Sequence, residues 1–180
     1  MELIKKRNKA LSLTSQREKE ISIERKRLTD LWHSEVKHYF ESNDFQCKRE
    51  SMSHWIANKL YLGEQTTANY NGHAEFAFFT PDPFIGVGQV TTTQGLWLFE
   101  LVNPLGESLE LKLKVEIDNK EKSLDRIIDK LKRTVPYRLL DYKFKFYKYD
   151  KNKSWTSQEQ QFQIANDLQQ FLTSIILQPQ

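Results

Sequence analysis

The chain has 180 residues, of which 38% are hydrophobic and 12% aromatic, and its formal net charge at pH 7 is +3. This composition is too apolar for a disordered chain, and no apolar run reaches the roughly 20 residues that a membrane-spanning helix needs. The single cysteine, Cys47, excludes an internal disulfide, and the N-terminal sequence lacks the apolar stretch of a secretory signal. The sequence therefore predicts a soluble cytoplasmic protein, with no cofactor and no membrane contact.

A long helix is the first predicted element. Residues 15–18 (Ser-Gln-Arg-Glu) have the spacing of a capping box, and apolar residues recur at helical spacing over residues 28–40. We predict a helix over about residues 16–41, with residues 1–13 as a helical or frayed extension. Charged residues surround its first half, so residues 1–27 are predicted to be a basic arm that partly projects and makes few contacts with the core.

A second helix is predicted after the turn at Asn43-Asp44, with Ser51 or Ser53 as its cap. Apolar and long side chains there follow helical spacing, namely Met52, Trp55, Ile56, Lys59 and Leu60. Gly63 suits the position just after a helix, and residues 63–72 are predicted to be a polar loop.

A β region is predicted to follow. Strands are expected over residues 73–79, 84–94, 95–102 and 109–117, with proline-containing turns at residues 80–83 and 103–106. Residues 109–117 alternate most regularly between aliphatic residues and Ser, Glu or Lys, which is typical of an antiparallel strand with one buried face.

The last third of the chain is predicted to contain a helix, a strand and a terminal helix. The first helix carries Leu124, Ile127, Ile128, Leu131 and Val135 and is stopped by Pro136. In the strand over residues 140–149, Tyr142, Phe144 and Phe146 are expected to face inward, and Lys143, Lys145 and Tyr147 outward. The terminal helix is expected to begin at Thr156 and to bury residues from Phe162 to Ile176. The fold class is therefore α+β: residues 28–180 form one domain with a mostly antiparallel sheet of about five strands and helices packed on it.

Glu110 and Lys112 lie on the same face of a predicted strand, and two further acids, Asp82 and Glu100, precede them. Together they resemble the Pro-Asp…(Asp/Glu)-x-Lys pattern of the restriction-endonuclease-like nucleases. The resemblance implies a magnesium-dependent nuclease, in which carboxylates hold the metal and the lysine orients water. A half-exposed strand alternating Leu with Glu and Lys yields the same tripeptide, and we favour that interpretation.

The four histidines and Cys47 show no metal-binding spacing: no Cys-x-x-Cys and no His-x-x-x-His occurs. The sequence therefore predicts no metal site. A glycine-rich phosphate loop and a nucleophilic serine motif are also absent from the sequence.

Two basic clusters suit nucleic acid. One combines Lys143, Lys145 and Lys148 with Tyr147, and the other consists of Lys5, Lys6, Arg7 and Lys9. Lysines attract phosphates, and exposed aromatic rings stack on unpaired bases. Alternatively, the strand lysines only keep a sheet edge from pairing with another chain, and the N-terminal helix binds a protein partner or a second copy.

Several stretches resemble an uncharacterised bacterial domain that is often found C-terminal to nuclease-like domains in restriction and defence systems. They are Leu31-Trp32, residues 53–56, and residues 113–117 followed by residues 122–131. The resemblance implies an accessory role without a catalytic residue. We therefore predict a non-catalytic module that binds nucleic acid or a nucleoprotein in a bacterial defence or mobile-element context. The alternatives are a protein–protein adaptor or immunity-type protein and, after that, a magnesium-dependent nuclease.

Overall fold

The computed structural model describes residues 2–82, 86–102, 121–133, 142–154, 157 and 161–176. The helices are α1 (Glu2–Glu41), α2 (Glu121–Arg133) and α4 (Leu168–Ile176), and the strands are β1 (Gln46–Ile56), β2 (Lys59–Tyr70), β3 (His73–Pro81), β4 (Val87–Thr92), β5 (Gly95–Val102), β6 (Lys143–Lys148) and β7 (Gln163–Ala165). The α+β class is confirmed. The sheet, however, has seven strands within the described residues rather than about five.

The chain divides into two compact units. The helical unit comprises residues 1–26 and 111–140, and the sheet unit comprises residues 27–110 and 141–180. The described helix in the second of these ranges, α2, therefore groups with the start of α1, whereas the sequence analysis placed it in the domain over residues 28–180. None of the described helices is long and apolar enough to cross a membrane.

In the helical unit, the first part of α1 packs against α2. Ala10 and Leu124 are fully buried together with Ile128, and the Lys6 Nζ lies 3.0 Å from Asp125 Oδ2. The Arg17 guanidinium donates two hydrogen bonds to the Leu131 carbonyl oxygen. The predicted extension over residues 1–13 is helical from Glu2 onward, and the arm has a packing partner within the chain. The sequence analysis expected residues 1–27 to make few contacts with the core; the contacts described here lie within the helical unit, on the side of α1 that faces α2.

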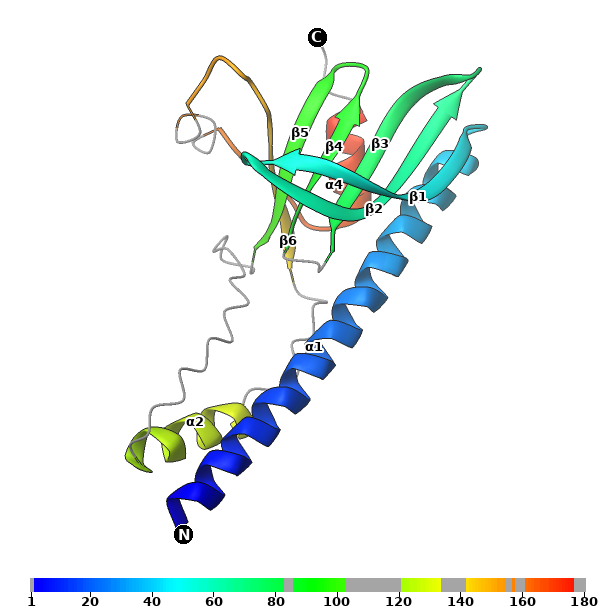
Figure 1. Cartoon of the computed structure of the whole chain (residues 1–180). Coiled ribbons are helices and arrows are strands. Elements are labelled where there is room, and N and C mark those ends of the chain that lie inside the picture. The colour runs from blue at the N-terminus through cyan, green and yellow to red at the C-terminus, as the bar shows by residue number, and fades with distance from the viewer. Residues whose placement is uncertain are drawn as a thin grey trace. The chain divides into compact units, whose positions relative to one another are not determined.

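The sheet is an antiparallel meander in which each strand pairs with the next from β1 to β7 (Figure 1). Two-residue turns join the first three strands: Ala57-Asn58 and Asn71-Gly72 all have positive φ, between 50° and 84°. Two such residues in succession form the turn that matches the twist of a β-hairpin. Residues 51–63 are therefore the end of β1 and the start of β2, and the predicted second helix is wrong.

The false helical spacing arises because both faces of this hairpin carry apolar side chains. Ile56 is 5% exposed and packs on the inner face, whereas Trp55 points outward and is 68% exposed. Periodicity alone does not separate such a two-sided hairpin from a helix. Residues 63–70, expected to be loop, continue β2.

The larger core lies on one face of the sheet, under α1 and α4. Trp32, Val36 and Phe40 come from α1, and Phe171 of α4 stacks on Phe144 of β6 with 5.0 Å between ring centroids. A stripe of apolar residues at helical spacing thus becomes buried, as the sequence predicted for α1.

A second, smaller cluster lies on the opposite face. There Ile56 and Tyr61, near the tip of the β1–β2 hairpin, pack against Phe79, Leu98 and Tyr147. In Figure 1 the hairpin (cyan) crosses in front of the central strands, and α4 (red) lies behind them. The sheet is therefore covered on both faces.

Among the described C-terminal residues, 161–176, only the last part is helical. Residues 163–165 form strand β7, and α4 begins at Leu168, where Asp167 Oδ1 accepts a hydrogen bond from the Gln170 backbone amide at 2.8 Å. This is the bond of an N-terminal cap, so Asp167 starts the helix that the sequence placed earlier.

The prediction of α2 is confirmed, and the predicted strand over residues 109–117 lies outside the described residues.

Gly63 permits a close approach between β2 and β3. A Cβ atom at this position would lie 2.1 Å from the Thr80 carbonyl oxygen and 2.8 Å from Pro81 Cα, which are backbone atoms that cannot turn aside. We expect Gly63→Ala to destabilise the sheet unit by at least about 2 kcal/mol, measured by urea denaturation. Gly72→Ala is the control, because no atom lies within 4 Å of its Cβ and its cost is limited to the positive φ of 84°. Equal stability losses would contradict this account of Gly63.

Candidate functional site

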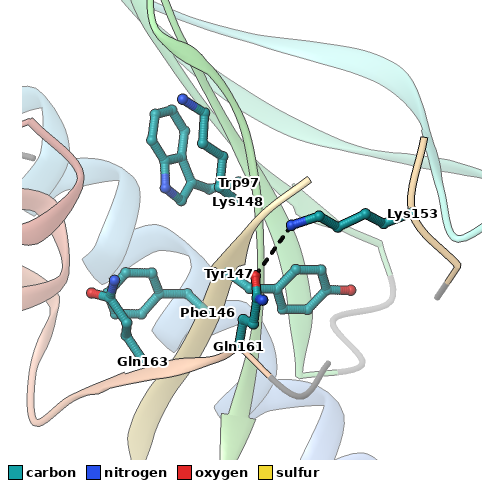
Figure 2. A pocket seen from close by; sticks show the side chains of 7 residues that line it. All are labelled: Trp97, Phe146, Tyr147, Lys148, Lys153, Gln161 and Gln163. Carbon is teal, nitrogen blue, oxygen red and sulfur yellow. Dashed lines mark hydrogen bonds between the residues drawn. The ribbon is translucent and has the colours of Figure 1, made fainter. Parts of the chain in front are cut away.

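A cavity of about 180 Å³ opens in the sheet unit where β7 leaves β6. The β6–β7 pairing ends at Phe146 and Gln163, and the cavity lies beyond that pair. Its lining, shown in Figure 2, is aromatic, cationic and amide-bearing: Trp97, Phe146, Tyr147, Lys148, Lys153, Gln161 and Gln163. No carboxylate is among these residues.

Trp97 and Lys148 face each other across β5 and β6. They are partners in the strand register, and the Lys148 Nζ lies 5.2 Å from the centroid of the indole ring. Lys148 extends along the indole in Figure 2. Gly95 leaves room for this side chain, because a Cβ there would lie 3.0 Å from Lys148 Cε. A lysine over the face of a tryptophan is held by the negative potential of the ring.

The indole of Trp97 is only 1% exposed, and its Nε1 has no acceptor within hydrogen-bonding distance among the described residues. A buried N–H group without a partner costs about 1–3 kcal/mol, and few occur in folded proteins. This donor is therefore the unusual feature of the cavity wall.

Lys153 and two glutamines form another part of the wall. The Lys153 Nζ donates to the Gln161 Oε1 at 3.3 Å, as the dashed line in Figure 2 marks. The carboxamides of Gln161 and Gln163 add groups that can both donate and accept. Sequence reasoning singled out neither glutamine.

Tyr147 does not face solvent as expected. It is 9% exposed and packs against Ile56, Phe79 and Leu98, because the hairpin tip covers the face of β6 on which it lies. Its ring is therefore not available for stacking on bases, which corrects the role suggested by the sequence.

Lys145 lies on the same face of β6 as Tyr147, and its charge is already paired. Its Nζ lies 2.8 Å from Glu100 Oε1 and 4.7 Å from the centroid of the Phe162 ring. Lys143, at the start of β6, is partly buried. Of the four β6 residues proposed from the sequence, Tyr147 and Lys148 line the cavity, whereas Lys143 and Lys145 do not.

The N-terminal basic cluster belongs to the helical unit. Lys5, Arg7 and Lys9 are exposed on α1, whereas Lys6 is paired with Asp125. The two basic clusters thus come from different units of the chain.

The acid–lysine group is only partly described. Glu110 and Lys112 lie outside the described residues. Asp82 is exposed at the end of β3, where its backbone amide donates to the Leu62 carbonyl oxygen at 2.7 Å, and Glu100 is paired with Lys145. Within the described part of the chain, no group of three or more His, Cys, Asp or Glu residues could hold a metal ion.

His33 is buried in the interface between α1 and the sheet. Its Nδ1 lies 2.7 Å from Thr66 Oγ1 and its Nε2 lies 2.8 Å from Thr80 Oγ1. Burial, and to a lesser degree the nearby Arg49 charge, lowers the pKa of His33 to about 3. The ring is therefore neutral at physiological pH and has a structural role.

Trp97 could have been found from the sequence only in part. Side chains alternate along a strand, so Lys148 shares a face of β6 with the inward-facing Phe144 and Phe146. It therefore lies on the opposite face from Lys143 and Lys145. Its partner on β5, however, depends on the strand register, which a single sequence does not give.

The chain matches no protein-family model, no curated protein and no solved structure.

Proposed function

We propose that the chain is a non-catalytic binding module that contacts single-stranded nucleic acid through the surface around the Trp97 cavity. The observation that carries this proposal is the cationic and aromatic lining, in which Lys148 lies over Trp97 and no carboxylate is present. Lysines without a neighbouring carboxylate attract the phosphates of a strand, and the buried aromatic rings hold Lys148 in place beside the cavity. The weak resemblance to a domain of bacterial restriction and defence systems supports a role in that setting.

The charge of the whole chain fits a moderate affinity. The net charge is +3, and residues 1–30 hold nine Lys or Arg against five Asp or Glu. Such a bias attracts polyanions without making the protein a general nucleic-acid binder.

Charge reversal at the cavity tests the proposal. We expect Lys148→Glu combined with Lys153→Glu, which reverses both lysines of the cavity lining, to weaken binding to a labelled oligo-dT by at least about tenfold at low salt, measured by fluorescence anisotropy. Lys145 is left unchanged, because a carboxylate there would face Glu100 across the strand pair. Wild-type affinity should fall with salt at a log–log slope of about −0.7 per phosphate contacted.

The matched control is Lys19→Glu with Lys26→Glu, two exposed lysines on α1 that do not line the cavity. This variant has the same net charge as the test variant. If both lose affinity equally, only the overall charge matters and the cavity has no special role. A wild-type protein that binds no oligonucleotide at low salt would refute the proposal.

A protein–protein adaptor is the second candidate, and one observation favours it. The outer face of the β1–β2 hairpin carries Trp55, Leu60 and Leu62, which are 68%, 51% and 67% exposed. Trp55 and Leu60 are cross-strand partners, so their side chains share a face. An apolar contact of this kind would depend far less on salt than phosphate binding. Trp55→Ser should then abolish partner binding while leaving oligonucleotide affinity unchanged.

A further inference from the structure

We infer that the Trp97 cavity binds a phosphate monoester, and specifically the phosphorylated end of a nucleic-acid strand. The strand part of this inference rests on the proposed function, whereas the phosphate part rests on the cavity itself. Three observations carry it: a buried donor, the charge of the lining and the size of the cavity.

The buried donor is Trp97 Nε1. The residue is 1% exposed, lines the cavity and has no hydrogen-bond acceptor among the described residues. An indole N–H can only donate, so its partner must be an acceptor. In Figure 2 the nitrogen lies on the side of the indole toward Phe146 and Gln163, which are also lining residues. Nε1 itself has almost no surface exposed to the cavity, so an oxygen-rich ligand satisfies this donor after a small shift of the neighbouring lining side chains.

The charge of the lining selects an anion. Lys148 and Lys153 are the charged lining residues, and no Asp or Glu accompanies them. Lys148 forms no ion pair with a carboxylate among the described residues, and its Nζ is held over the Trp97 ring. A phosphate monoester carries about 1.5 to 2 negative charges at pH 7, whereas each phosphodiester within a strand carries one. Two ammonium groups therefore favour the monoester.

The size of the cavity favours an end group. Its volume of about 180 Å³ is close to that of cavities which hold benzene, and lies below the roughly 300–1,000 Å³ of pockets that enclose drug-sized ligands. A phosphate with its adjoining sugar carbons is of this scale, and a continuous strand is not. The Gln161 and Gln163 amides can donate to the remaining phosphate oxygens.

Three oligo-dT decamers test the inference: one with a 5′-phosphate, one with a 3′-phosphate and one with hydroxyl groups at both ends. We expect one phosphorylated strand to bind at least about tenfold more tightly than the hydroxyl strand, because hydrogen bonds to charged groups are strong. The indole ¹⁵N–H signal of Trp97 should shift on binding. It is one of four such signals, since the chain has four tryptophans, and Trp97→Phe assigns it.

Lys148→Met should abolish the preference for the phosphorylated end without disturbing the exposed surface around it. Lys143→Met is the matched control: it lies on the same strand, does not line the cavity, and should keep the preference. Lys148→Met also keeps the test decisive if Trp97→Phe fails to fold.

The outcomes separate this inference from the proposed function. Equal affinity for all three decamers, with an unmoved Trp97 signal, would overturn the inference and leave general strand binding intact. If no decamer binds at low salt but ribose 5-phosphate or inorganic phosphate shifts the Trp97 signal, the phosphate site stands and the strand proposal is refuted. If acetate shifts the signal as much as phosphate does, the preference for a phosphate monoester is refuted.

Discussion

The Phe171→Ala variant is expected to lose about 3 to 5 kcal/mol of unfolding free energy, the largest effect that we predict for a single substitution. Phe171 is completely buried, and its ring lies 5.3 Å from Phe99, 5.0 Å from Phe144 and 4.9 Å from Phe146, between ring centroids. Removing it opens a cavity between α4 and three aromatic residues that strands hold in place. Urea denaturation followed by tryptophan fluorescence measures the loss.

Phe162→Ala is the control for this substitution. Phe162 is 44% exposed and contacts the Lys145 ammonium, so its removal should cost less than about 1 kcal/mol. Similar losses for the two variants would mean that α4 does not contribute to the core in solution.

Lowering the pH from 7.5 to 4.5 is expected to remove about 2.5 kcal/mol of stability through His33 alone. The pKa of His33 is about 3 in the folded protein, chiefly because the ring is buried, and Arg49 lowers it further while Asp30 opposes this. The unfolded chain takes up a proton near pH 6.5, whereas the folded chain does not until about pH 3. Stability contributed by the neutral ring is therefore present above pH 6.5 and lost as the pH falls toward 3.

His33→Gln isolates this contribution from that of the carboxylates. The variant should be less stable than the wild type at pH 7.5, because a glutamine does not reproduce both threonine contacts at 2.7 and 2.8 Å. It should also lose less stability on acidification, so the two curves of unfolding free energy against pH should converge below pH 5. Parallel curves would show that His33 does not titrate as described.

Elements whose spacing and burial agree were predictable from the sequence. Residues 28–40 of α1 and residues 124–131 of α2 bury the stripes that their periodicity indicated, and β6 buries Phe144 and Phe146. In these parts of α1 and α2 only one face meets a core. In β6 the face that carries Phe144 and Phe146 is clearly apolar, so pattern and structure coincide there as well.

The β1–β2 hairpin was missed for a physical reason. Its tip presents Ile56 to one side and Trp55 to the other, so neither simple alternation nor a polar outer face was visible. Asn71-Gly72, a strong turn signal, was placed within a polar loop because residues 63–72 were assigned to the connection after a predicted helix. Because the hairpin was missed, the sequence analysis also did not predict that its tip covers Tyr147, which is why that ring is buried.

The cavity was predictable only as a set of residue types. Lys148 was noticed as a cation near aromatic residues, but Trp97 is about 50 residues away along the chain and meets Lys148 through the β5–β6 register. Gln161 and Gln163 join them through β7, which the sequence placed in a helix. Long-range pairing is information that local patterns do not contain.

The hydrogen bonds of His33 also determine where α1 can sit along the sheet. A neutral imidazole has one donor and one acceptor, so one threonine hydroxyl must accept from the ring and the other must donate to it. Sliding the helix by one turn, about 5.4 Å, would leave three buried polar side chains without partners while the apolar residues could still find apolar neighbours. His33 and the two threonines therefore fix the position of the helix along the sheet. Hydrophobic contacts attach the helix to the sheet, and these three polar side chains select a single alignment among those that hydrophobic contacts alone would allow.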